Sequence, residues 1–256
     1  MGIFNFPREV LSRTDNLDFL VTSYPKFFVK KYKVPANKVK SIFWIELLGK
    51  LLRKFDPLFR KLNFETDLIM DWIADTIYSL FFIQNSDFLF MGFGNSCCKI
   101  IKKAKKKNIK TIYFLNNLAP VYRKKIIDTE FDKLGLPKPL EVENKTLTSK
   151  MNESIKMADY IGALSAWQKK TYIDEGVDES KIFLSFLGVD PSVFFPKKVK
   201  KDKFIVTYVG NDFVRKGVKY LIEAFNSLKL DNSELWIVGK NPRKVVERIV
   251  KIEKNN

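Results

Sequence analysis

Residues 204–242 read FIVTYVGNDFVRKGVKYLIEAFNSLKLDNSELWIVGKNP and contain a strand, a helix and a second strand in succession. Residues 204–209 are all β-branched or aromatic, as in a buried strand, and residues 235–238 are a second apolar run that ends at Gly239. Between them, apolar side chains recur every three or four residues over 217–228, which is typical of a helix with one buried face. Because two strands joined by a helix pair in parallel, this stretch predicts an α/β fold with a parallel sheet.

A polar loop, residues 210–216, joins the first of these strands to the helix. It begins with Gly210 and ends with Arg215 and Lys216, immediately before the helix. A glycine after a strand lets backbone amides approach a bound group, and a helix N-terminus favours negative charge. Two cations at the same place can neutralise a phosphate. The loop is therefore a candidate diphosphate site, although the same residues also fit a simple turn beside two solvated charges.

The rest of the chain repeats this alternation of strands and helices. Strands are predicted at residues 18–23, 87–91, 110–115, 160–164 and 182–186, and helices at residues 41–55, 66–83, 97–107, 152–158 and 165–173. Residues 137–150 and 196–203 are polar or basic and contain proline, which predicts surface connections. We expect two α/β lobes: a Rossmann-like domain over residues 1–193, a linker over 194–203, and an incomplete Rossmann-like lobe over 204–256.

Composition narrows the chemistry that the chain can perform. The 256 residues include 46 Lys and Arg, 29 Asp and Glu and no histidine, for a net charge of +17. The absence of histidine excludes Ser-His-Asp and Cys-His nucleophilic sites and histidine metal ligands, and no metal site is predicted. The two cysteines, Cys97 and Cys98, are adjacent, which fits neither a disulfide framework nor a zinc site and favours a reducing compartment. With no apolar run long enough to span a bilayer and no secretory signal, a cytoplasmic location is expected, or one at the inner membrane surface.

The positive charge has several interpretations: binding to nucleic acid, to an anionic membrane surface or to an anionic substrate, or a lysine-rich composition that provides solubility. The lysines are spread along the chain and no nucleic-acid motif is present, so no nucleic-acid partner is expected. The lysines of helix 97–107 are expected to form its solvated face. Residues 41–62 combine aromatic with basic side chains, which fits either contact with anionic lipid or a core helix with a basic outer face. The residues concerned are Trp44, Phe55, Phe59, Lys50, Arg53, Lys54, Arg60 and Lys61.

A second stretch, ADYIGALSAWQKKTYIDEGVDESKIFLSFLGVDPSVFFP, runs from residue 158 to residue 196. It contains the segments AD-I-S, GV-KI and GVD-F-P in that order, and the stretch 204–242 follows with KGV-LI-AF after its glycine loop. In this order and spacing the two stretches resemble the retaining family-four glycosyltransferases of the GT-B fold. Each motif alone is weakly specific, and the resemblance rests on the whole set.

The resemblance implies a two-domain GT-B fold and transfer of a sugar from a nucleotide-sugar donor to a glycan or lipid-linked acceptor. It implies no cofactor besides the donor substrate. Gly210, Arg215 and Lys216 match the donor diphosphate site, and departure of a nucleoside diphosphate depends more on charge stabilisation than on a strong base. No catalytic residue is assigned. Glu130 and Glu153 also suit the family's N-terminal domain, less specifically.

The chain departs from the family pattern at three places. Asn116 and Asn117 stand in the region where the family commonly has a histidine, the opening strand and glycine loop are short, and the family's downstream pair of glutamates is expected beyond residue 256. An alternative is therefore a catalytically inactive or split-enzyme fragment that acts as a binding protein, with a second chain completing its C-terminal lobe. A basic nucleic-acid-binding protein is a third hypothesis, and it predicts binding that weakens steeply with salt.

Overall fold

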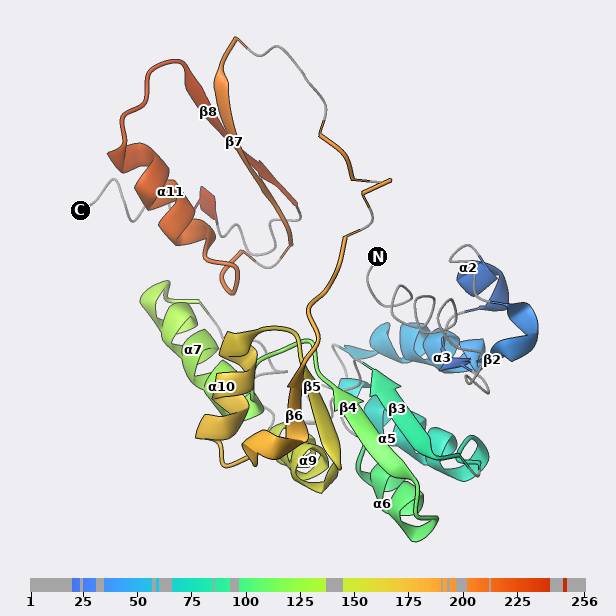
Figure 1. Cartoon of the computed structure of the whole chain (residues 1–256). Coiled ribbons are helices and arrows are strands. Elements are labelled where there is room, and N and C mark those ends of the chain that lie inside the picture. The colour runs from blue at the N-terminus through green and yellow to red at the C-terminus, as the bar shows by residue number, and fades with distance from the viewer. Residues whose placement is uncertain are drawn as a thin grey trace. The chain divides into compact units, whose positions relative to one another are not determined.

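The structure, a computed structural model, describes residues 20–23, 25–30, 35–56, 59, 66–84, 86–92, 97–136, 145–189, 191–192, 194–196, 202–211, 213–239 and 246–247. The expected opening of the first lobe, much of the end of helix 41–62 and half of the linker, residues 197–201, lie outside the described residues. The fold is mixed α/β with parallel sheets, as the sequence predicts (Figure 1). No helix in the described ranges combines the length and the hydropathy needed to cross a membrane.

Packing divides the chain into two units. The N-terminal unit consists of residues 1–120 and 145–187, and the C-terminal unit consists of residues 121–144 and 188–256. The expected boundaries put residues 121–144 in the first lobe, whereas the structure groups this mid-chain segment with the C-terminal residues.

A four-stranded, all-parallel sheet forms the centre of the N-terminal unit. Its strands, in the order in which they pair, are β3 (Phe88–Gly92), β4 (Lys110–Phe114), β5 (Tyr160–Ala163) and β6 (Ile182–Leu184). Phe114 lies opposite Gly162 in this register, and a Cβ atom on Gly162 would lie 2.2 Å from the Phe114 ring. The β5 glycine therefore makes room for a buried aromatic ring, which also packs edge-on against Phe183 with ring centroids 5.4 Å apart.

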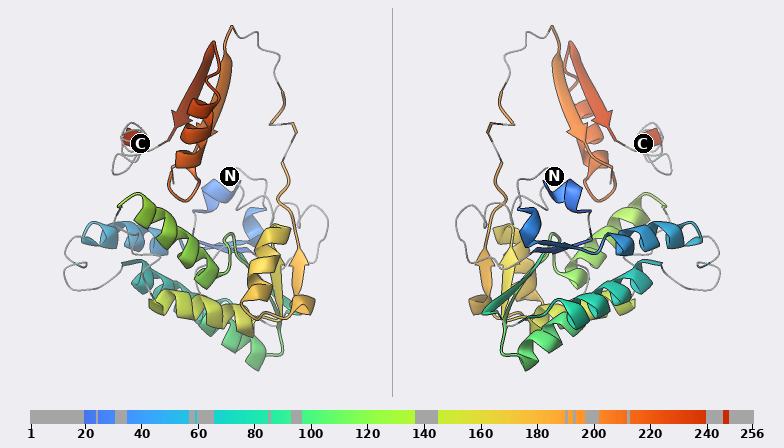
Figure 2. Two further views of the ribbon diagram at one scale, coloured as in Figure 1. Left: turned by 90° about the vertical axis from the view of Figure 1, so that its left-hand side faces the viewer. Right: turned by 90° about the vertical axis from the view of Figure 1, so that its right-hand side faces the viewer.

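Helices α5 (Thr66–Phe81), α6 (Cys98–Lys106) and α9 (Lys145–Met157) lie side by side in this unit, with α6 in the middle (Figure 2). Ile101 and Ala104 of α6 are fully buried. Helix α10 (Ala166–Asp174) packs against β5 and β6, and a short helix, η3 (Glu179–Lys181), follows it and leads into β6. The first turns of α9 were expected to be a surface connection, but Leu147 and Met151 are buried and extend the helix.

A smaller parallel pair, β1 (Leu20–Thr22) and β2 (Val39–Ser41), precedes these elements, with helices α2 (Lys26–Lys30) and η2 (Ala36–Lys38) between the two strands. Helix α3 (Phe43–Arg53) follows β2 and packs against α5. The helices meet closely at Gly49, where an added Cβ atom would lie 3.4 Å from the Met70 side chain.

The C-terminal unit contains β7 (Phe204–Val209), α11 (Val218–Ser227), β8 (Ser233–Val238) and α7 (Pro120–Lys133). The first three elements form the strand–helix–strand unit predicted from the sequence, and β7 pairs with β8 in parallel over its whole length. Its core joins the two helices and the loop before α11; the buried residues are Ile127, Phe131, Leu134, Leu136, Phe213, Val214, Val218 and Ile222. No helix was predicted at α7, and Leu228, at the end of the predicted helix 217–228, is the exposed C-cap of α11.

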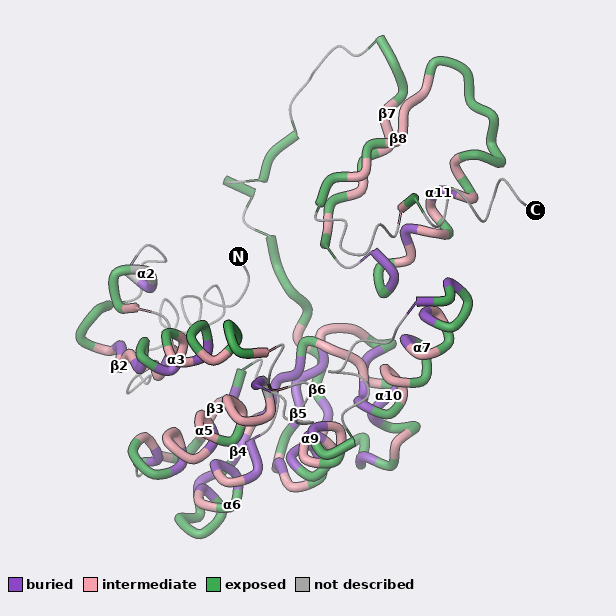
Figure 3. The backbone as a smooth tube through the Cα atoms, turned by 180° about the vertical axis from the view of Figure 1, so that it is seen from behind, coloured by how far each residue is buried: buried purple, intermediate pink, exposed green. Residues whose placement is uncertain are grey.

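The four-stranded sheet of the N-terminal unit and the β7–β8 sheet differ in how deeply their residues are buried (Figure 3). Most residues of β4 and β5 are buried, whereas β7 and β8, whose residues are all described, contain no buried residue. Tyr208 and Ile237 point to the core of the C-terminal unit, and Val209, Trp236 and Val238 are exposed. We call these three exposed side chains the outer face of β7–β8. Parallel sheets are usually covered on both sides, so this face is unusual for its class.

Candidate functional site

The loop between β7 and α11 begins where both parallel strands end. The Gly210 amide donates a hydrogen bond to the Val238 carbonyl over 2.9 Å, so the loop starts beside the last residue of β8. A Cβ atom on Gly239 would lie only 1.8 Å from the Gly210 carbonyl oxygen. Glycine at position 239 therefore lets the two chain segments pass backbone against backbone. In open α/β sheets, ligands bind at this carboxyl edge of the strands.

Lys216 folds back over Gly210. A Cβ atom on Gly210 would lie 2.8 Å from Lys216 Nζ and 2.9 Å from Tyr208 Oη. An ammonium group and a phenol hydroxyl thus converge on the glycine backbone, and any larger residue would displace them. Arg215 lies in the same loop, and both cations are exposed to solvent. The structure places the three predicted residues in one loop and brings two of them, Gly210 and Lys216, together.

Helix α11 starts directly after this loop. Its N-cap is Gly217, which has a φ of 70° and no side chain that could cap the helix. The loop is anchored from inside, because the Gly217 and Val218 amides donate to the carbonyls of Val214 and Phe213, two buried residues. Within the described residues, no side chain accepts a hydrogen bond from the first-turn amides of α11. The first-turn amides after Val218 and the helix dipole favour an anion beside Lys216.

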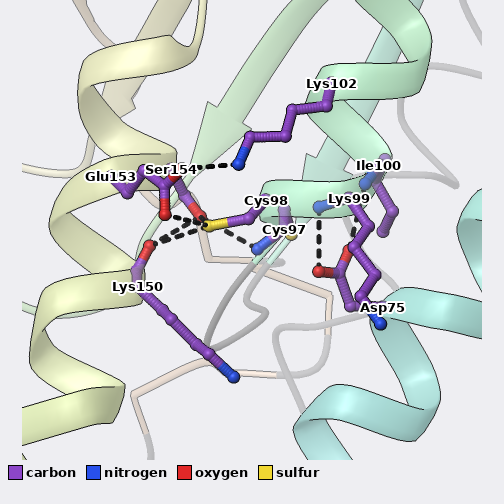
Figure 4. A network of polar contacts seen from close by, with 9 residues as sticks. All are labelled: Asp75, Cys97, Cys98, Lys99, Ile100, Lys102, Lys150, Glu153 and Ser154. Atoms are coloured by element: carbon purple, nitrogen blue, oxygen red, sulfur yellow. Dashed lines mark hydrogen bonds and ion pairs between the residues drawn. The ribbon is translucent and has the colours of Figure 1, made fainter.

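Helix α6 also follows a parallel strand, but protein groups occupy its N-terminus (Figure 4). The Asp75 carboxylate accepts hydrogen bonds from the Lys99 and Ile100 amides at 2.9 and 3.1 Å, and the Ser154 hydroxyl accepts one from the Cys97 amide at 3.0 Å. Burial raises the pKa of Asp75, and the two backbone hydrogen bonds only partly oppose that effect. Because its first amides are satisfied within the protein, we assign no anion site to α6.

The adjacent cysteines lie at the same helix start and are both buried. The Cys98 sulfur lies 3.2 Å from both the Lys150 carbonyl oxygen and the Ser154 hydroxyl (Figure 4). Burial raises the pKa of both thiols, so they stay protonated at neutral pH. A protonated, buried thiol is a poor nucleophile, and these cysteines act as small packing groups.

The carboxyl edge of the N-terminal sheet is held by Gln168, a buried residue of α10. Its side-chain nitrogen donates to the carbonyls of Leu115 and Asn117 at 2.8 and 2.6 Å, and its oxygen accepts from the Leu164 amide at 2.7 Å. One side chain therefore ties together the loops that follow β4 and β5. Among the described side chains, the side-chain amide of Asn117 donates a hydrogen bond only to the side chain of Asn116, over 2.9 Å. The loop after β4, where the resemblance would place a histidine, carries Asn116 exposed to solvent and Asn117 partly buried.

The two glutamates that suit the family serve different units. Glu130 of α7 accepts hydrogen bonds from Lys133 at 2.8 Å and from Tyr220 of α11 at 2.8 Å. Burial pushes the pKa of Glu130 up, but these two hydrogen bonds outweigh it and lower the pKa overall. Glu153 pairs with Lys102 over 2.7 Å, which lowers its pKa. Each carboxylate joins two helices.

The lysines of α6 are partly engaged with its neighbours. Lys103 and Lys107 donate to the carbonyls of Leu80 and Ile83 at 3.2 Å each, near the C-terminal end of α5. The Lys99 ammonium lies 4.1 Å from the centre of the Trp72 ring. With the Lys102–Glu153 pair, these contacts show that many of the lysines of α6 join it to neighbouring helices.

Several residues of these networks were not predicted. Tyr208 lies within an ordinary strand pattern. Gln168, Asp75 and Ser154 lie within ordinary helix patterns and contact residues that are distant in sequence. A polar residue inside an apolar stripe was the available signal for Asp75 and Ser154. Among the described residues, no group of three or more Cys, Asp or Glu side chains is arranged to hold a metal ion. No protein-family model matches the chain, and no curated protein is significantly similar to it.

Proposed function

We propose that this chain is a GT-B-type glycosyltransferase whose C-terminal unit binds the diphosphate of a nucleotide sugar. The sugar would pass to a glycan or lipid-linked acceptor, with no cofactor besides the donor substrate. The resemblance to the retaining family-four enzymes motivates this assignment. The observation that carries it is the Lys216 ammonium group folded over Gly210, beside the uncapped start of α11.

The chemistry of this loop suits a leaving diphosphate. When the bond between the anomeric carbon and the donor phosphate breaks, negative charge develops on the phosphate oxygen. An ammonium group and helix amides at that oxygen stabilise the charge without a proton transfer. Arg215 adds a second cation within the same loop, and Tyr208 Oη adds a hydroxyl near Gly210. The site therefore needs no histidine, which agrees with a chain that has none.

Isothermal titration with UDP, GDP and ADP tests the binding step. One of these nucleotides should bind the wild-type chain, and Lys216→Ala should weaken binding by about tenfold or more, because a charge-assisted contact to phosphate is lost. Lys105→Ala is the matched control, since it removes an exposed lysine of α6, where the helix start is already occupied. Absence of binding by the folded wild type, or an equal loss in both variants, would contradict the proposal.

Sugar transfer tests the reaction itself. A panel of nucleotide sugars incubated with the chain and a lipid-linked or glycan acceptor should give product with the donor whose nucleotide binds. Binding without transfer would support the anion site but reject the proposal that this chain transfers a sugar by itself. Binding of duplex DNA in place of nucleotides, with a steep salt dependence, would favour the nucleic-acid alternative.

A second candidate function is supported by the outer face of β7–β8. Trp236 and Val238 are each half exposed on a parallel sheet, a class that is normally covered on both sides. We infer, as the alternative, a binding protein whose C-terminal unit is completed by further strands and helices from a second polypeptide. Transfer by this chain alone would reject that alternative. Transfer that requires a second product carrying the paired glutamates would support it.

A further inference from the structure

Helix α3 presents large apolar side chains to solvent on the side opposite its packed face. Ile45 and Gly49 are buried, and Gly49 lies against the Met70 side chain of α5. The other side of the helix and its C-terminal end carry five apolar residues that are between 45% and 62% exposed: Phe43, Trp44, Leu47, Leu51 and Phe55. We call these five residues the α3 surface. Contiguous exposed apolar groups of this size mark an interaction site more often than chance exposure does.

Basic side chains lie within the same surface. Lys50 and Lys54 are exposed and follow Leu47 and Leu51 by three residues each, so helical geometry puts all four on one side. Glu46 is the only acidic residue between positions 40 and 55, and it is less exposed than the lysines. Glu46 lies one turn before Lys50 and leaves Lys54 without a carboxylate one turn before it. Aromatic and leucine side chains beside lysines are the composition of helices that lie in the surface of an anionic bilayer.

We propose that the α3 surface binds an anionic lipid membrane, with the helix lying parallel to it. Apolar side chains would enter the boundary between headgroups and acyl chains, while Lys50 and Lys54 would contact the lipid phosphates. A net charge of +17 favours the approach to an anionic surface. The inference is independent of the donor site, because it rests on a different unit and is measured without a nucleotide.

Co-sedimentation with vesicles tests the proposal. The wild-type chain should pellet with vesicles made of equal parts phosphatidylcholine and phosphatidylglycerol, and much less with phosphatidylcholine alone. Lys50→Glu with Lys54→Glu should reduce binding to the anionic vesicles by more than about tenfold. Lys105→Glu with Lys106→Glu is matched in charge and exposure but lies on α6, and it should retain most of the binding. An equal loss in the two double variants would show that net charge alone causes the binding, and it would overturn the proposal.

The apolar part of the surface is tested by Leu47→Glu with Leu51→Glu, which should also abolish pelleting. Sedimentation in lipid-free buffer tests the other occupant, a second copy of the chain. A wild type that self-associates, with a variant that sediments more slowly as a monomer, would identify that second copy and overturn the proposal.

Tryptophan quenching gives a measurement that does not depend on how these glutamate variants fold. Brominated acyl chains in the anionic vesicles should quench the emission of the wild type. Trp44→Phe should remove most of the quenching, and Trp236→Phe, at a residue of similar exposure in the C-terminal unit, should not. Quenching that persists in Trp44→Phe and disappears in Trp236→Phe would place the membrane contact in the C-terminal unit and overturn the proposal.

Discussion

Helices α6 and α11 both begin after a parallel strand, yet the groups that contact their N-termini differ. Asp75 and Ser154, from the neighbouring helices α5 and α9, take up the amides at the start of α6. The start of α11 has Gly217 as its cap, Lys216 beside it and apolar anchors behind it. Both arrangements satisfy packing, but only the second leaves backbone amides and a cation available to a ligand. A strand–loop–helix pattern alone is therefore insufficient evidence of an anion site.

The two helices also differ in what holds them. Buried apolar residues hold both helices, but α6 is also joined to α5 and α9 through its first amides and its lysines. Helix α11 shares its apolar cluster with α7 and is also joined to α7 by the hydrogen bond from Tyr220 to Glu130. An apolar anchor fixes the position of α11 without using the groups at its N-terminus. This separation of anchoring from binding is the property that the following predictions test.

Phe131→Ala should have the largest effect on stability. The side chain is buried between α7 and α11, and truncation of a buried phenylalanine costs about 3–5 kcal/mol. Hydrogen exchange should show faster exchange in α11 and β8 and unchanged protection in β4 and β5. Val121→Ala, at an exposed position of the same helix, is the control and should change little. Equal loss of protection in β4 would show that the two units unfold as one.

Gly239→Ala and Gly210→Ala should separate folding from binding. The first forces a Cβ atom against the backbone of Gly210 and should lower the free energy of unfolding by about 2 kcal/mol or more. The second meets the movable ends of Lys216 and Tyr208, so it should cost less than about 1 kcal/mol while weakening nucleotide binding. Denaturant unfolding and titration calorimetry measure the two effects. A Gly210→Ala variant with wild-type affinity would remove the main support for the site.

Asp75→Ala should destabilise the N-terminal unit without affecting the candidate site. It leaves one buried and one partly buried amide group of α6 without their acceptor, which costs about 1–3 kcal/mol. Asp75→Asn keeps an acceptor oxygen and should cost less. Nucleotide affinity, measured where both variants are folded, should equal that of the wild type. Lost affinity in Asp75→Ala would mean that α6 takes part in binding after all.

Glu130→Gln should have the smallest effect, and that effect should depend on pH. Hydrogen bonds from Lys133 and Tyr220 hold the pKa of Glu130 below its ordinary 4.5, although burial opposes them. The stabilisation is therefore present above pH 4.5 and is lost as the pH falls through the lower folded-state pKa. At pH 7 the variant should lose at most about 1 kcal/mol, because solvent screens the pair. Thermal unfolding across this range measures the difference, and Tyr220→Phe should make its pH dependence shallower. A constant difference at all pH values would contradict the assignment.

Local patterns predicted most elements of the fold. The strands β3, β4, β5 and β7 and the helices α3, α5, α6 and α11 match periodicities that can be read along the chain. Helix α7 was missed because Ile127 and Phe131 are buried while Val121 and Ile126 are exposed, so its apolar residues do not form one stripe. For the candidate site, the sequence predicted the loop and its two cations, but it did not distinguish this loop from the start of α6.

The amino-acid sequence by itself determined most of the strands and helices, their parallel pairing and the position of a glycine and two cations before α11. These features depend on residues close together in the chain, where spacing is set by helix and strand geometry. Only the tertiary structure decided that α7 joins the C-terminal unit, that Asp75 and Ser154 close the start of α6, and that Lys216 turns back over Gly210. Each of these depends on packing in three dimensions, which is not encoded in any local period.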